Sequence, residues 1–294
     1  MTRVLRAQGM VFSAMALLLV AGAALLPRMA PNTEMLIVAV LIVVLGVPHG
    51  ALDTVFARIR FSPPTRCAWL GFGLRYIGCM AIVVAVWFVT PVAFLIAFLT
   101  LSAVHFSGDP LPGSSLFIRG VQGGAVLVLP AFQYSAELTT LFSLLVGPSA
   151  AGMVVTWLSI AAVPWGIAVI LGAAMTVATS KHAAVELLAV GILGAAAPPL
   201  LAFAVYFCGM HAARHMLRTA SYASNVRWQS LARSAAIPMV GVGAAGLVGW
   251  LVFGDVQLEV KVIQLLFVGL ASLTLPHMML VEPVRLAGWS DGRQ

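Results

Sequence analysis

The chain has 294 residues, of which 62% are hydrophobic and only 9% are charged, and its mean hydropathy is +1.06. Because a soluble domain is about 45–50% apolar, this composition excludes an ordinary water-soluble protein and makes lipid the expected solvent. The formal net charge is +7, but the lysines and arginines are thinly spread between apolar runs. This spacing argues against nucleic-acid binding and indicates topology signals at a membrane surface.

Long apolar runs without the alternation of barrel strands predict a bundle of membrane-spanning helices. A helix needs about 20 apolar residues to cross a bilayer. We therefore expect one all-α domain over residues 1–294, a polytopic integral membrane protein with about ten spans and a range of eight to eleven. The range allows for short runs and for an additional or re-entrant segment at 138–145. In chain order the expected spans are 10–27, 34–50, 67–89, 91–106, 117–134, 151–176, 183–197, 199–217, 235–253 and 258–281.

Arginine-bearing ends of the chain and loops alternate with acid-bearing loops. By the positive-inside rule, this pattern predicts a multi-pass protein of the inner (cytoplasmic) cell membrane with both termini in the cytoplasm. The second, fourth, eighth and tenth spans would then all end on the cytoplasmic side. The arginines are Arg3, Arg6, Arg58, Arg60, Arg66, Arg218, Arg227, Arg233, Arg285 and Arg293, and the acids are Glu137, Asp255 and Glu259.

Histidines gather at the ends of those four spans. Ionisable residues within spans are rare, face the bundle interior and usually mark a site. His182 is the exception, because it stands beside Lys181 in an expected surface loop. The other five, which share a predicted membrane depth, are His49, His105, His211, His215 and His277.

His211 and His215 are four residues apart on a strongly helical stretch, so both rings project from one face and can reach a common metal. Taken alone, this spacing also fits two unrelated histidines. The arrival of His49 and His105 at the same depth favours a single four-histidine metal site, since imidazole is a common ligand of iron, copper and zinc. His277, directly after Pro276, could be a fifth ligand, a polar group beside the site, a substrate contact or an interfacial histidine.

Two aspartates each follow a histidine by four residues: Asp53 follows His49, and Asp109 follows His105. If the helix persists through each motif, the carboxylate lies beside that histidine and can orient its ring by accepting from the second ring nitrogen. One aspartate could instead be a ligand in a two-histidine, one-carboxylate triad. Either could also be a helix-end charge near water. Glu282 is expected to meet solvent or Arg285.

These residues are compatible with three functional classes, and a di-iron enzyme of the desaturase or hydroxylase type ranks below them because it normally needs more histidines than these five. The first is an enzyme that binds one metal ion through its histidines. The second is a bis-histidine haem protein for electron transfer, which a Soret absorbance band would reveal. The third is a transporter in which the histidines relay protons, and it would hold no stoichiometric metal.

Four motifs follow one another along the chain: Pro-His-Gly-x-x-Asp at 48–53, His-Phe at 105–106, Tyr-Phe followed by His-x-x-x-His within 206–215, and Pro-His-Met-x-Leu at 276–280. In this order and combination they resemble the Brp/Blh-type β-carotene 15,15′-dioxygenases of bacteria and archaea. The resemblance covers nearly the whole chain. It implies an integral membrane enzyme that uses non-haem Fe(II) and O₂ to cleave β-carotene at its central double bond into two molecules of retinal.

The same resemblance implies that His49, His105, His211 and His215 are the iron ligands. Asp53, Asp109 and His277 would then lie beside these ligands or contact the substrate. The expected partners are β-carotene, O₂ and membrane lipid, with a functional link to a retinal-binding rhodopsin. A hydrocarbon substrate also calls for an apolar cavity, in which shape is the main basis of selection.

Overall fold

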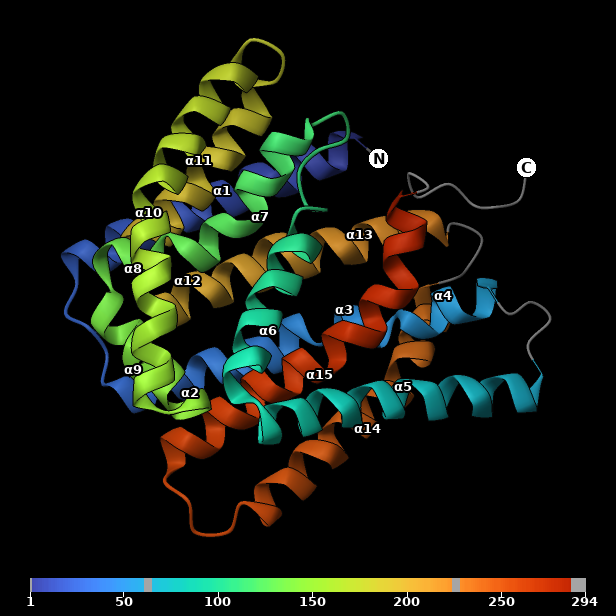
Figure 1. Ribbon diagram of the computed structural model, residues 1–294. Helices are drawn as coiled ribbons and strands as arrows, with labels where there is room; N and C mark the ends of the chain where they lie inside the picture. The colour runs from blue at the N-terminus through green and yellow to red at the C-terminus, as the bar shows by residue number, and fades with distance from the viewer. Residues whose placement is uncertain (1, 61–64, 224–227, 287–294) are drawn as a thin grey trace.

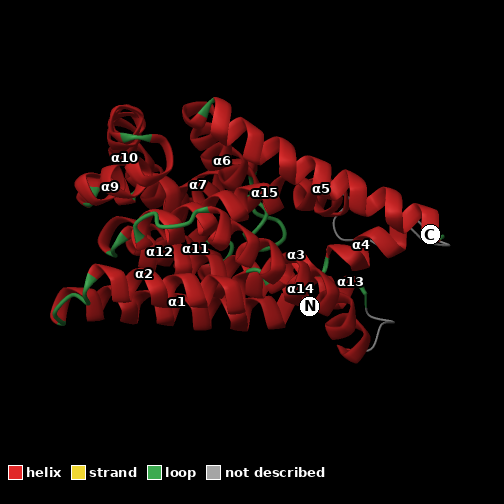
Figure 2. Ribbon diagram, turned by 90° about the horizontal axis from the view of Figure 1, so that it is seen from below, coloured by secondary structure: helices red, strands yellow, loops and turns green. Residues whose placement is uncertain are grey.

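The computed structural model describes residues 2–60, 65–223 and 228–286, and within these ranges it is helical, with no strand (Figures 1 and 2). Arg227 and Arg293 lie outside the described residues. The elements are α1 Thr2–Leu25, α2 Pro31–Leu41, η1 Ile42–Gly46, α3 Pro48–Ala51, α4 Asp53–Arg60, α5 Arg66–Val89, α6 Pro91–Phe106, α7 Leu116–Val128, α8 Pro130–Gln133, α9 Ser135–Val146, α10 Pro148–Val177, α11 Lys181–Ala196, α12 Pro199–Val205, η2 Tyr206–Ala212, α13 Ala213–Tyr222, α14 Trp228–Val252 and α15 Leu258–Leu286, where η marks a π-helix.

The described part of the chain contains eight helical segments that are long and apolar enough to cross a membrane. They are Thr2–Leu25, Pro31–Ile59, Arg66–Val89, Leu116–Gln133, Pro148–Val177, Pro199–Tyr222, Ala232–Val252 and Leu258–Leu286. The expected all-α multi-pass membrane protein is confirmed, and eight spans lie within the expected range. The count is below ten because α6 and α11 have 16 residues each, short of the roughly 20 that a span needs.

Proline and small polar residues set where several helices begin. Besides the four-residue helices α3 and α8, four described helices (α2, α6, α10 and α12) start with a proline, whose missing N–H would have no partner in the first turn. The side chains of Thr65, Ser115 and Ser180 instead accept a hydrogen bond from a first-turn backbone N–H of α5, α7 and α11. Between α9 and α10, Gly147 has φ of +84°, a conformation that favours glycine, and there the chain turns back on itself.

The bundle has two outer faces and an inner group of broken helices. Helices α1 and α5 lie on opposite faces (Figure 2). Helix α1 packs along α11, and α5 packs along α15. Between the two faces the π-helical segments η1 and η2 pack against each other, and both are surrounded by the main hydrophobic core. These π-helices and the helices that follow them, α3 and α13, carry three of the histidines that the sequence places at one depth, namely His49, His211 and His215.

The π-helices locally interrupt the two inner spans next to the histidines. Segment η1 ends at Gly46, just before His49, and η2 contains His211. A Cβ atom on Gly46 would lie 2.3 Å from the Phe207 ring, so the close approach of η1 and η2 requires glycine. Single π-turns are often found at functional sites. By contrast, α15 runs on through Pro276 without ending there.

Candidate metal centre

Five histidines meet inside the bundle. They come from α3 (His49), the last turn of α6 (His105), η2 (His211), α13 (His215) and α15 (His277). Their exposed fractions range from 2% to 7%. The centre of the His49 ring lies 5.0 Å from that of His211, 5.4 Å from that of His215 and 5.1 Å from that of His277. The His105 ring centre is 4.6 Å from that of His211. The structure thus brings all five together.

His182 lies apart from this cluster. It is exposed in the first turn of α11, which begins one residue earlier at Lys181 and is capped by Ser180. The exposure agrees with the expected surface position, although the residue belongs to a helix and not to a loop.

Four of the clustered rings have an acceptor at Nδ1. The Nδ1 atom of His49 lies 2.5 Å from the carbonyl oxygen of Gly46, and that of His105 lies 3.1 Å from a Glu282 carboxylate oxygen. The other two rings are held by aspartates, which are described below. An acceptor at Nδ1 selects the tautomer that carries the proton there, so Nε2 keeps its lone pair for a metal.

The opposite ring nitrogens point to a metal. The Nε2 atoms of His105, His211 and His277 are buried and have no hydrogen-bond partner among the described residues. A buried polar atom left unpaired costs about 1–3 kcal/mol. His49, His105 and His277 each offer a ring nitrogen, and these three atoms lie within 4.8 Å of one another. The residues present therefore fit a metal ion, which would satisfy nitrogens that otherwise lack a partner.

The two aspartates serve different histidines from those their spacing suggested. Asp53 accepts from Nδ1 of His277 at 2.6 Å, and Asp109 lies 3.1 Å from Nδ1 of His211. The expected neighbours were His49 and His105. The physical reason is that neither helix persists: α3 ends at Ala51, and α6 ends at Phe106. Each aspartate is thereby turned towards a histidine of another helix.

Each aspartate also accepts a hydrogen bond from a tyrosine hydroxyl. Tyr76 of α5 donates to Asp53 at 2.9 Å, and Tyr206 of η2 donates to Asp109 at 2.8 Å. We call Tyr76, Asp53 and His277 the Asp53 array, and Tyr206, Asp109 and His211 the Asp109 array. In both arrays the carboxylate accepts hydrogen bonds from the tyrosine hydroxyl and from the histidine ring, and together these bonds fix its orientation.

Arginines fix the turn that carries Asp109. Arg119 donates to the carbonyl of Ser107 at 3.0 Å. Arg218 donates to the carbonyls of Gly108, Asp109 and Pro110, and Arg214 also donates to that of Asp109, at 2.8 Å. Burial opposes ionisation of Asp109, but the His211 ring, Arg218 and the Tyr206 hydroxyl outweigh it and lower the pKa of that carboxyl below its usual value.

Neither Glu282 nor Tyr76 is expected at the histidine cluster from the sequence alone. Glu282 does contact Arg285, as expected, but its other carboxylate oxygen faces His105. The available signal was an acid directly after the last expected span, five residues from His277. Tyr76 stands among apolar residues of α5 and gives no comparable signal, because tyrosine is common at membrane depth near the interfaces.

Comparison with known proteins identifies the family. The model of the β-carotene 15,15′-dioxygenase family matches residues 40–284, more than half of the chain. The chain belongs to this family. It is 34% identical to the β-carotene 15,15′-dioxygenase of an uncultured marine bacterium (66A03), over 82% of this chain and 90% of that protein. It is 26% identical to a probable β-carotene 15,15′-dioxygenase Blh of Halobacterium salinarum, over 81% of each. No solved structure matches significantly.

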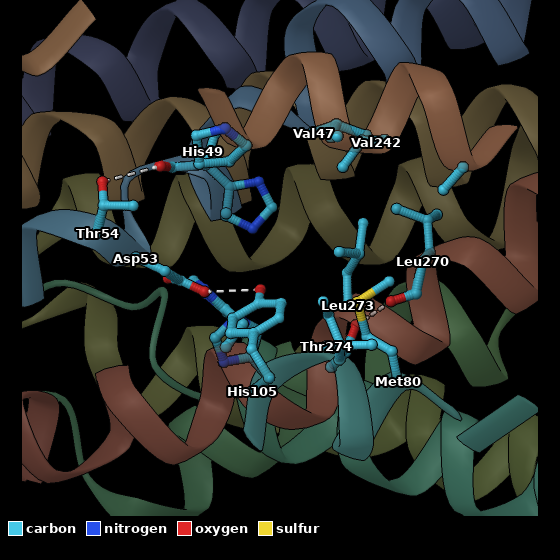
Figure 3. Close-up of a pocket in the computed structure, with 18 of the residues that line it drawn as sticks. Val47, His49, Asp53, Thr54, Met80, His105, Val242, Leu270, Leu273 and Thr274 are labelled. Carbon is cyan, nitrogen blue, oxygen red and sulfur yellow. Dashed lines mark hydrogen bonds and ion pairs between the residues drawn. The ribbon is translucent and has the colours of Figure 1, made fainter. Parts of the chain in front are cut away.

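In this member of the family the histidine cluster opens onto a cavity of about 880 Å³. That volume is near the upper end of the roughly 300–1,000 Å³ typical of ligand pockets. Figure 3 shows His49, Asp53 and His105 towards one end, and Met80, Val242, Leu270 and Leu273 towards the other. The cavity lies between α5, α14 and α15 and is lined mostly by apolar side chains. The site thus joins a polar cluster to an apolar chamber.

Proposed function

We propose that the chain cleaves the central 15,15′ double bond of β-carotene with O₂ to give two molecules of retinal, at an Fe(II) ion held by His49, His105, His211 and His215. The observation that carries this proposal is the placement of two buried Nε2 nitrogens, those of His105 and His211, at the wall of an apolar cavity, where neither has a hydrogen-bond partner among the described residues. The family to which the chain belongs supplies the reaction. The haem and transporter alternatives have no comparable support.

The side chains would divide the work between binding the metal and binding the polyene. Neutral imidazoles suit iron, and when Fe(II) is bound it supplies a site at which O₂ can be activated. Asp109, Glu282 and the Gly46 carbonyl accept from the Nδ1 nitrogens and keep the opposite nitrogens aimed inward. The apolar side chains hold a hydrocarbon by shape and exclude water from it.

The proposal includes a location and a topology. The arginine-bearing ends and loops support an inner-membrane protein with both termini in the cytoplasm. Retinal released there would be available to a retinal-binding rhodopsin in the same membrane. Reporter fusions at Glu137 and at the C-terminus test the topology. Alkaline phosphatase should be active only at Glu137, and a cytoplasmic fluorescent protein should be bright only at the C-terminus.

The decisive experiment is expression in bacteria that make β-carotene, followed by pigment extraction and metal analysis of the purified protein. We expect loss of β-carotene, appearance of retinal, about one iron per chain and no Soret band. Alanine at any of the four proposed ligands should abolish retinal formation, whereas His182→Ala should not. A purified protein that holds only zinc, or a carotenoid pool that stays unchanged, would contradict the proposal.

A further inference from the structure

We propose that His277 is an additional ligand of the same metal ion and that Asp53 and Tyr76 hold it in place. This inference rests on the proposed function, because it extends the metal site described there. It concerns a histidine that the four-ligand set leaves out.

Position is the first argument. The His277 ring centre lies 5.1 Å from that of His49, 5.0 Å from that of His105 and 5.0 Å from that of His215. His277 therefore sits among the proposed ligands and not at their edge. It also belongs to the compact group, with His49 and His105, whose three ring nitrogens lie within 4.8 Å of one another. A metal bound by the other two would lie within reach of the third.

The two ring nitrogens of His277 are the second argument. The ring is 3% exposed, and its Nε2 atom is buried without a hydrogen-bond partner among the residues that the structure describes. An interfacial histidine would turn such a nitrogen to water. Its Nδ1 atom is instead held by Asp53 at 2.6 Å. A carboxylate at one nitrogen and an inward lone pair at the other is the arrangement that metal-bound histidines adopt.

The third argument is that this arrangement is built from three separate helices. Asp53 begins α4, Tyr76 comes from the middle of α5, and His277 lies in α15. The Tyr76 hydroxyl donates to the second carboxylate oxygen of Asp53 at 2.9 Å. The Asp109 array repeats this set of contacts around His211, which is one of the four proposed ligands. Because His277 has the same kinds of partner as His211, an aspartate and through it a tyrosine, we assign it the same role as a metal ligand.

The test uses full-length protein in detergent, loaded with Fe(II) and assayed for iron content and for the iron dissociation constant. His277→Asn is the informative variant, because the Asn amide can still donate to Asp53 from the place of Nδ1 but has no nitrogen at the place of Nε2. We expect iron affinity to fall by more than the roughly 10- to 100-fold that accompanies loss of an outer partner. Asp53→Asn and Tyr76→Phe should lower the affinity less, since they leave the ring in place.

Rescue and folding controls separate metal binding from a merely structural role. In His277→Gly, added imidazole should restore iron binding, which a packing defect would not allow. The chelated forms of wild type and His277→Asn should unfold at similar temperatures, so a drop seen only with iron reports the lost ligand. A His277→Asn protein that binds iron with the wild-type affinity would overturn this inference and leave the four-histidine function intact. A wild-type protein without iron or retinal formation would overturn the proposed function itself.

Discussion

The two tyrosine–aspartate–histidine arrays have the same parts but stand in different surroundings. In the Asp109 array, Arg214 and Arg218 donate hydrogen bonds to the main-chain carbonyl of Asp109. Arg214 also forms an ion pair with the buried Glu186 at 2.9 Å. Beside the Asp53 array a neutral donor holds the main chain: the Thr54 hydroxyl donates to the carbonyls of Ala51 and Ser234. Asp53 also lines the cavity, and Asp109 does not.

The difference indicates two ways of holding a histidine. Arginines fix the Asp109 array by donating hydrogen bonds to main-chain carbonyl groups, and such charged hydrogen bonds are stronger than neutral ones. The Asp53 array faces the apolar cavity, where an additional charge would have to be desolvated beside a hydrocarbon. We therefore expect changes in the Asp109 array to affect the fold as well as the metal, and changes in the Asp53 array to affect mainly the metal.

The largest expected effect comes from breaking the support of the Asp109 array at Arg214. Its guanidinium is fully buried, and Glu186 is 1% exposed. Arg214→Met would leave the Glu186 carboxylate buried and unpaired, and loss of one partner of a buried pair costs about 3–5 kcal/mol. We expect a large fall in membrane level and in unfolding temperature. Adding Glu186→Gln should recover part of the loss, and a single variant as stable as wild type would show that the pair does not support the turn.

The second prediction compares the aspartates directly. Asp109→Asn and Asp53→Asn should each weaken iron binding by about 10- to 100-fold, because each removes the charged partner of an Nδ1–H group. Only Asp109→Asn should also lower the unfolding temperature of the iron-free protein, since it removes a negative charge from beside several arginines. The measurements are iron titration and thermal unfolding after chelation. Equal unfolding temperatures would remove the proposed distinction between the arrays.

Much of the architecture could be predicted from the sequence, because hydropathy is a local property of composition. The long apolar runs identify the spans, and the positions of His49, His105, His211 and His277 at span ends predict their meeting at one depth. Family membership also followed from short motifs. The assignment of metal ligands stays a prediction, which the alanine substitutions at the four histidines test.

The pairing of the carboxylates could not be predicted from spacing. A distance of four residues implies a shared face only while the helix continues, and the breaks after Ala51 and Phe106 remove that condition. The π-helices η1 and η2 are likewise not apparent in the apolar pattern, although Gly46 marks the place where they approach. Tyr76 and Glu282 enter the site through tertiary packing of α5 and α15, which no local motif encodes.

A third, smaller effect is expected at the tyrosines. Tyr206→Phe and Tyr76→Phe each remove one hydrogen bond to a carboxylate, a loss of about 1.5–3 kcal/mol for bonds to charged groups. Part of this loss should appear in iron affinity, because the carboxylate gains freedom to turn away from its histidine. Tyr76→Phe should lower the stability of the chelated protein less than Tyr206→Phe does, although both variants should lose iron affinity. Iron titrations and unfolding curves of the two variants measure both quantities, and a larger loss of stability in Tyr76→Phe than in Tyr206→Phe would contradict this prediction.

The smallest effect is expected at His182, which lies outside both arrays and so sets the baseline for the comparison. The side chain is exposed in the first turn of α11, one turn before the buried Glu186. A surface substitution away from such features usually changes stability by no more than about 0.5 kcal/mol. The sign should be neutral or slightly favourable, because alanine has a higher helix propensity than histidine. His182→Ala should therefore retain wild-type iron content, unfolding temperature and retinal formation. A loss of iron in this variant would mean that α11 transmits changes to the metal through Glu186 and Arg214, and the rigidity assigned to the Asp109 array would then extend to the protein surface.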